Sequence, residues 1–134
     1  MNFDLLEQEI NQVKNETMAK VGAEDARYIR RIEKIVRYSE ALGRVLLMMS
    51  WFPPCWFAGT AILAFSKIME NMELGHNVIH GQYNFMNDDR FKGSTYEWDI
   101  AGTSENWRKT HNYNHHTYTN INGVDHDIGY SVLR

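Results

Sequence analysis

Residues 45–65 read VLLMMSWFPPCWFAGTAILAF, an apolar run without one charged side chain. A run of this length is about what one α-helix needs to cross the roughly 30 Å apolar core of a bilayer. Pro53 and Pro54 fall in its middle, where proline removes backbone donors and breaks a helix. The run therefore predicts a hairpin, with one helix ending near Trp51 and a second running from about Cys55 into the GHNVIHG segment. A buried core helix is the alternative, since the mean hydropathy of the chain is only −0.51.

The flank before this run is basic and helical in pattern. Six Lys and Arg side chains lie between residues 27 and 44 against two Glu, and positively charged flanks favour the cytoplasmic side of a membrane. Both open ends of the hairpin are therefore expected at the cytoplasmic face. Residues 4–44 alternate charged and apolar groups at helical spacing, which predicts amphipathic helices at the interface. The candidates for one apolar face are Ile29, Ile32, Val36 and Leu42.

Composition excludes several other classes of protein. A formal net charge of −3 gives no global basic field for nucleic acid, so no nucleic-acid partner is expected. The single Cys55 rules out an internal disulfide framework and is interpreted as a packing residue. The N-terminal sequence MNFDLLEQEI carries acids where a secretory signal needs a basic segment, so export is not expected.

All six histidines lie beyond residue 75, and five of them form two spaced clusters. His76 and His80 are four residues apart, which on a helix places both imidazoles on one face. A second helix is expected to begin near Ser104 or Glu105. On it, His111, His115 and His116 repeat this spacing and add an adjacent ring about 100° around the helix. Clusters of this kind predict a metal site, although neutral imidazole suits iron, zinc, copper and nickel alike. The remaining histidine, at position 126, is predicted to lie on the surface or to support a ligand.

Glu73 raises a rival interpretation of the same residues. It precedes His76 by three positions, which is the Glu-x-x-His spacing of ferritin-like di-iron bundles. That architecture needs a second such pair, and no other histidine here has a glutamate three positions before it. Glu73 is therefore predicted to support the ligands or to face along the helix, rather than to bind the metal.

These residues resemble those of the membrane fatty acid desaturases, most closely the bacterial acyl-CoA or linoleoyl-CoA desaturase-like branch. The resemblance rests on SKIMENMELGHNVIHGQYNFMND, on the EWD at 97–99 and on NWRKTHNYNHHTYTNINGVDHDIGYSVLR, which together cover about half the chain. It implies two iron ions held by histidines, with His76 and His80 in the first histidine box and His111, His115 and His116 in the second. The third box of such enzymes has no counterpart here, so the chain is interpreted as an N-terminal fragment that is inactive alone.

The resemblance also implies the chemistry and the partners. An unactivated methylene is too weak an acid for any protein base, so a cofactor must remove the hydrogen atom. The implied reaction introduces a double bond into a fatty acyl chain, carried on coenzyme A or a lipid. It uses O₂ and electrons from a ferredoxin with its reductase or from a cytochrome b5-type protein. Four polar side chains are candidates to orient the imidazoles by hydrogen bonding: Asn77, Asn112, Asp125 and Asp127.

The predicted fold is therefore all-α, an integral membrane helical protein with its active site facing the cytoplasm. We expect amphipathic helices over 1–44 and a partial desaturase domain over 45–134. Two alternatives stay open, a related membrane alkane or lipid hydroxylase and a soluble histidine-rich zinc-binding module. The sequence leaves open the double-bond position, the acyl chain length and carrier, the electron donor and the oligomeric state.

Overall fold

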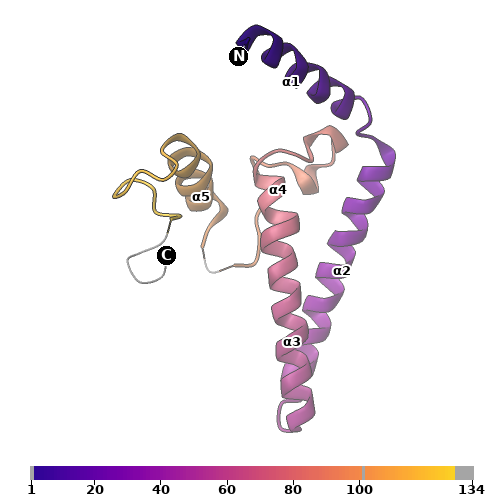
Figure 1. Ribbon diagram of the computed structural model, residues 1–134. Coiled ribbons are helices and arrows are strands. Elements are labelled where there is room, and N and C mark those ends of the chain that lie inside the picture. The colour runs from indigo at the N-terminus through magenta and orange to yellow at the C-terminus, as the bar shows by residue number, and fades with distance from the viewer. Residues whose placement is uncertain (1, 101, 129–134) are drawn as a thin grey trace.

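A computed structural model describes residues 2–100 and 102–128 of the chain (Figure 1). Within these ranges the regular elements are all helical and no strand occurs, which confirms the all-α prediction. Residues 129–134, the end of the third segment on which the family resemblance rests, lie outside the described part.

The first two helices confirm that residues 4–44 are helical. Helix α1 covers Phe3–Met18 and α2 covers Ala23–Met48, with a short break between them. The expected apolar face of α2 is buried at Ile29, Ile32 and Val36. Leu42 is instead half exposed, because the next two buried positions on α2 are Glu40 and Gly43.

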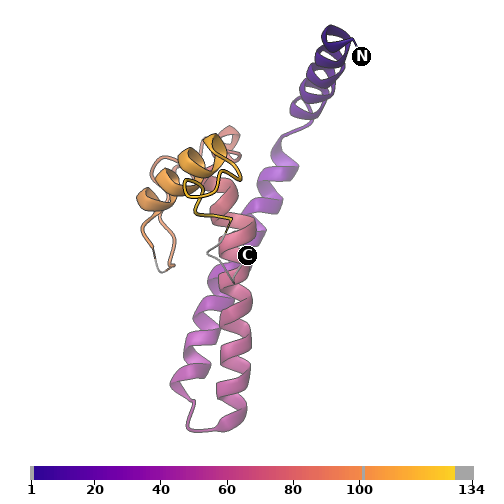
Figure 2. The same ribbon diagram turned by 60° about the vertical axis from the view of Figure 1, so that its left-hand side comes forward.

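Helix α3, Pro53–Met69, runs antiparallel to α2 and forms a long hairpin with it (Figures 1 and 2). The chain turns between α2 and α3, just before the prolines rather than at them. Pro53 and Pro54 occupy the first helical positions, where a missing N–H costs nothing because that donor would have no intrahelical partner. The predicted hairpin is thus present, but its turn lies a few residues earlier than expected.

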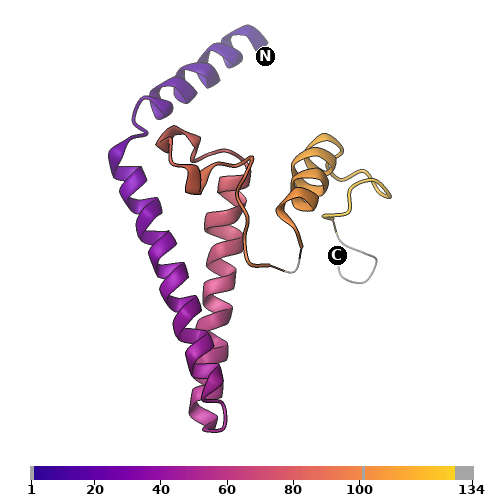
Figure 3. The same cartoon turned by 180° about the vertical axis from the view of Figure 1, so that it is seen from behind.

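The two arms of the hairpin approach closely in the half nearer the turn, and the tip is exposed (Figures 1 and 3). A Cβ atom on Gly43 would stand 2.9 Å from the backbone nitrogen of Leu63, so only glycine allows this approach of α2 to α3. The buried residues of α3 are Gly59 and Ser66 alone, so α3 is not the buried core helix of the alternative interpretation. The large side chains around the turn, Trp51 among them at 81% exposure, face outward. In the described part of the chain, no helix is both long enough and apolar enough to cross a membrane.

Beyond Met69 the helix continues without a break into the first histidine segment. A π-helical stretch, η1, covers Glu70–Gly75, and α4 covers His76–Ile79. Short 3₁₀ turns follow at Asn84–Met86 and Asp89–Phe91. The second predicted helix begins where expected, with α5 at Ser104–Trp107 and a second π-helical stretch, η4, at Arg108–His115.

The buried core lies at the open end of the hairpin, beside the histidine segments. It joins Ile29 of α2 to residues of η1, α4 and the loops that follow. Seen from behind in Figure 3, α5 and η4 stand beside the end of α4, on the side away from α2. The core thus supports the two histidine segments at the end of the hairpin opposite its apolar tip. Its buried members are Ile29, Leu74, Val78, Ile79, Phe91, Tyr96 and Trp98.

Candidate metal centre

The two histidine clusters, 31 or more residues apart in sequence, come together in one group of five rings. The His76 ring centroid lies 4.7 Å from that of His80 and 4.9 Å from that of His111. The His116 ring lies 4.8 Å from His80 and 5.0 Å from His111, and the His115 ring stacks on His111 at 5.1 Å. His111 is therefore the ring at the centre of the group.

The imidazoles of α4 point their Nε2 atoms at one another. The Nε2 atoms of His76 and His80 are 3.0 Å apart. Two nitrogens bound to a single ion at about 2.1 Å each would be separated by a similar distance when they occupy neighbouring coordination positions. The pair can therefore serve one ion.

The imidazoles of η4 are oriented by two carboxylates. His115 Nδ1 lies 3.0 Å from both carboxylate oxygens of the buried Asp125, and His111 Nδ1 pairs with the carboxylate of Asp127. A carboxylate accepts a hydrogen bond from Nδ1–H and so fixes the tautomer that leaves the Nε2 lone pair free. Both rings consequently offer Nε2 as the ligand atom.

Electrostatics favour neutral imidazoles at the first cluster. Burial, followed by the neighbouring rings of His111 and His116, lowers the pKa of His76. Burial, followed by His76, His116 and His111, lowers the pKa of His80 to about 4. Metal binding requires the unprotonated ring, so both residues are ready to bind at neutral pH.

The geometry defines two overlapping groups of possible ligands. Ligand atoms of His76, His80 and His111 lie within 4.8 Å of one another, and so do those of His111, His115 and Asp127. His111 Nε2 is buried and has no hydrogen-bond partner among the described residues. His111 belongs to both ligand groups, and a buried imidazole nitrogen without a partner fits a metal ion better than it fits a packing role.

Three other candidates form hydrogen bonds with groups other than the imidazoles. The Glu73 carboxylate accepts a hydrogen bond from Tyr28 at 3.4 Å and belongs to neither ligand group. The side-chain amides of Asn77 and Asn112 donate to the backbone carbonyls of Glu73 and Ile79, at 2.7 and 3.0 Å.

His116 and His126 are the two histidines that belong to neither ligand group. His116 stands in the ring group but in neither set of ligand atoms. His126 is exposed on the loop beyond η4, in keeping with the surface position predicted for it.

Comparison with known proteins identifies the family. The chain is 47% identical over 133 residues, 99% of its length, to the NADPH-dependent stearoyl-CoA 9-desaturase of two Mycobacterium tuberculosis strains, CDC 1551 / Oshkosh and ATCC 25618 / H37Rv. It is 37% identical over 76 residues, 56% of its length, to the sn-1 linoleoyl-lipid 6-desaturase of Synechocystis sp.. The chain belongs to the fatty acid desaturase family.

This desaturase chain spans 31% of the length of the mycobacterial relatives and 21% of the cyanobacterial one. None of these relatives is named as a hydroxylase or a zinc-binding module, so the comparisons favour neither alternative. No protein-family model and no solved structure matches the chain.

One ring of the candidate metal centre is absent from the sequence-based list of candidates. Trp107 stacks on His111 with ring centroids 4.1 Å apart, and its centroid lies 5.2 Å from that of His76 and 5.8 Å from that of His80. Trp107 also borders an open pocket of about 540 Å³ between η1 and α5. Its position four residues before His111, one helical turn away, is the signal that could have pointed to it.

Proposed function

We propose that the protein is a fatty acid desaturase that uses O₂ to introduce a double bond into a fatty acyl chain at a histidine-ligated di-iron centre. The observation that carries the proposal is the convergence of five imidazoles from two distant segments. They converge in a chain that is 47% identical, over almost its whole length, to a stearoyl-CoA 9-desaturase.

In this proposal the five rings bind two iron ions, one near His76 and His80 and one near His115, with His111 and His116 between them. Iron supplies the oxygen activation that removal of hydrogen from an unactivated methylene requires. The chain itself holds the ligand nitrogens, and Asp125 and Asp127 keep two of the rings in the tautomer that presents Nε2. Trp107 covers one side of the rings and so limits the access of water to them.

The substrate is a fatty acyl chain carried on coenzyme A or on a lipid, since the relatives are named for stearoyl-CoA and for a linoleoyl lipid. The mycobacterial relative is named as NADPH-dependent, which supports an electron supply that begins at a nicotinamide. A ferredoxin with its reductase, or a cytochrome b5-type protein, is the class of donor that would deliver single electrons to iron.

We place the hairpin in a membrane and the histidines at its cytoplasmic face. Because α2 and α3 run antiparallel, a hairpin that enters the membrane from one side returns to that side. Exposed aromatic side chains at its tip support this placement. In this arrangement α1 lies at the interface, α2 forms one arm of the hairpin, and 45–134 form part of the desaturase domain.

Product analysis tests the function. The full-length protein is supplied with stearoyl-CoA, O₂, NADPH and a ferredoxin with its reductase, and the fatty acid methyl esters are separated by gas chromatography. We expect an unsaturated ester that is absent from the His80→Ala control. A hydroxylated product instead would favour the hydroxylase alternative, and iron-free protein that binds zinc would favour the zinc module.

A further inference from the structure

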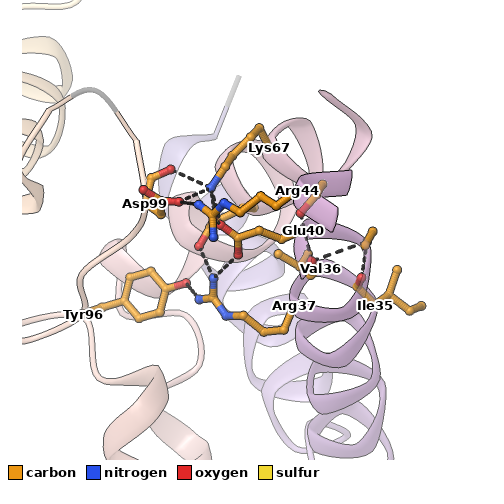
Figure 4. Close-up of polar contacts among 11 residues, drawn as sticks. Ile35, Val36, Arg37, Glu40, Arg44, Lys67, Tyr96 and Asp99 are labelled. Atoms are coloured by element: carbon orange, nitrogen blue, oxygen red, sulfur yellow. Dashed lines mark hydrogen bonds and ion pairs between the residues drawn. The ribbon is translucent and has the colours of Figure 1, made fainter. Parts of the chain in front are cut away.

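Six charged side chains form one closed network between the hairpin and the segment that leads into α5 (Figure 4). Three are cations and three are carboxylates, so the network is neutral. Two of the carboxylates, Glu40 and Glu70, are only 5% and 0% exposed. We call this network the charge cluster, and its members are Arg37, Glu40 and Arg44 of α2, Lys67 of α3, Glu70 of η1 and Asp99.

Four members of the charge cluster alternate in a ring. Arg37 donates to Glu70 at 2.7 Å and to Glu40 at 3.3 Å. Lys67 donates to Glu40 at 2.7 Å and to Glu70 at 3.3 Å. Each buried carboxylate therefore has both cations as partners, which removes the large cost of an unpaired buried charge.

Asp99 attaches the loop to this ring. Lys67 Nζ donates to the carboxylate of Asp99 and to its backbone carbonyl, both at 2.8 Å, and Arg44 pairs with the same carboxylate. These hydrogen bonds hold the pKa of Asp99 well below its usual range. Three residues earlier, the Tyr96 hydroxyl lies 3.5 Å from Arg37. The segment before α5 is thus tied to both arms of the hairpin.

A continuous line of contacts leads from Asp99 to the histidines. The adjacent Trp98 packs against Gly75, directly before His76. The Trp98 ring meets the Trp107 ring edge to face at 5.1 Å, and Trp107 stacks on His111. A displacement of Asp99 would therefore move the ring that lies at the centre of the candidate metal centre.

Stability alone does not account for such a network. Buried ion pairs contribute little net stability, and apolar side chains of similar volume often replace them without loss. Their best-attested use is to fix one arrangement among several that are similar in energy. Here the arrangement in question is that of the second histidine segment relative to the first.

We propose that Asp99 is a positioning residue of the metal centre: held by Arg44 and Lys67, it sets the placement of α5 and His111 relative to His76 and His80. The inference rests on the metal centre of the proposed function. In this inference the charge cluster fixes the geometry of the metal centre and does not itself bind a ligand.

The test compares Asp99→Asn with the unaltered protein, both full-length and purified in detergent without metal. The probe is Co²⁺, followed by its visible absorption spectrum and by titration. We expect Asp99→Asn to bind Co²⁺ about 10-fold to 100-fold more weakly, the range seen when groups that orient ligands are removed, and to show an altered spectrum. Asp99→Glu, which keeps the carboxylate, should recover part of the affinity. The matched control is Asp89→Asn, since Asp89 is exposed and takes no part in the charge cluster.

The outcomes separate the two proposals. Failure of the unaltered protein to bind Co²⁺ would overturn the metal centre and this inference with it. Unchanged affinity and spectrum in Asp99→Asn would overturn the positioning role and leave the metal centre standing. If Asp99→Asn loses its cooperative thermal transition, Arg44→Gln decides, because it removes one of the two cations that hold Asp99 while the buried Glu40 and Glu70 keep Arg37 and Lys67 as partners. The proposal requires both cations to hold Asp99, so weaker Co²⁺ binding in a folded Arg44→Gln protein supports the inference, and unaltered binding shows that the Arg44–Asp99 pair does not position the centre and refutes it.

Discussion

Gly75 lies directly against the indole of Trp98: a Cβ atom at position 75 would stand 2.0 Å from Cε3 of that ring. The Gly75→Ala substitution must therefore displace the Trp98 indole from its packing position against η1, directly before His76. We expect a loss of about 1–3 kcal/mol in the free energy of unfolding, the usual cost of overpacking, despite the better helix propensity of alanine. Gly102→Ala is the control, since nothing lies within 4 Å of a Cβ atom there. Equal thermal midpoints for the two variants would contradict the packing described for Trp98.

The depressed pKa of His80 makes the metal-free protein sensitive to acid. The pKa in the folded state is about 4, against an ordinary value of 6.5, so between these values the unfolded state binds more protons than the folded state. Stability then rises with pH across this window and falls as the pH is lowered through it. The thermal midpoint should drop between pH 6.5 and pH 4, and His80→Gln should reduce that drop. An identical pH profile in this variant would show that His80 is not the group responsible.

Asp125 should matter through the tautomer of His115. Burial acts to raise the pKa of the Asp125 carboxyl, but hydrogen bonds from the Asn120 backbone and from His115 outweigh it and lower this pKa. Asp125→Asn can no longer hold the Nδ1 proton as an anion does, so iron affinity should fall by roughly 10-fold to 100-fold. Iron titration monitored by absorbance measures the change, with the exposed Glu105→Gln as control. Affinities that agree within a factor of two would remove Asp125 from the site.

The membrane topology of the hairpin can be tested by cysteine labelling from outside intact cells, in a Cys55→Ser background. Lys20→Cys lies before α2 and Lys92→Cys lies between the histidine segments, and both positions are exposed. With both ends of the hairpin in the cytoplasm, neither should react with a membrane-impermeant maleimide until the cells are opened. Labelling at position 92 alone in intact cells would indicate that the chain crosses the membrane once, and would place the histidines on the outer side.

Most of the fold could be predicted from the periodicity of apolar residues and from the placement of the prolines. The helical pattern over residues 4–44, the hairpin and the start of α5 were all predictable, because each depends on local spacing and backbone chemistry. The position of the turn was missed by a few residues, since proline at a first helical position begins a helix as readily as it ends one. Leu42 was misplaced because its neighbours, Glu40 and Gly43, serve the contact with α3, and a contact between distant segments leaves no local pattern.

The site was predictable in its residue types but not in its supporting contacts. Spacing pointed to both histidine clusters, whereas their convergence depends on packing between distant segments. The three-residue spacing of Glu73 and His76 has its usual meaning in an α-helix. In the structure Glu73 lies instead in the wider π-helical η1, and its carboxylate contacts Tyr28. The ion-pair partners of Glu70 and Asp99 could not be predicted either, because a charged residue on a helix or in a polar loop is usually solvated.

The central claim, that the clustered imidazoles bind iron, is tested most directly by the iron content of single-alanine variants. Full-length protein is purified with each of His76, His80, His111, His115 and His116 changed in turn to alanine, alongside His126→Ala. Iron per chain is then measured by plasma mass spectrometry. Each of the five changes removes a ligand from a centre built by several segments, so we predict a loss of at least half the iron in every case, with near-normal content in His126→Ala. Normal iron in all five variants would contradict the account.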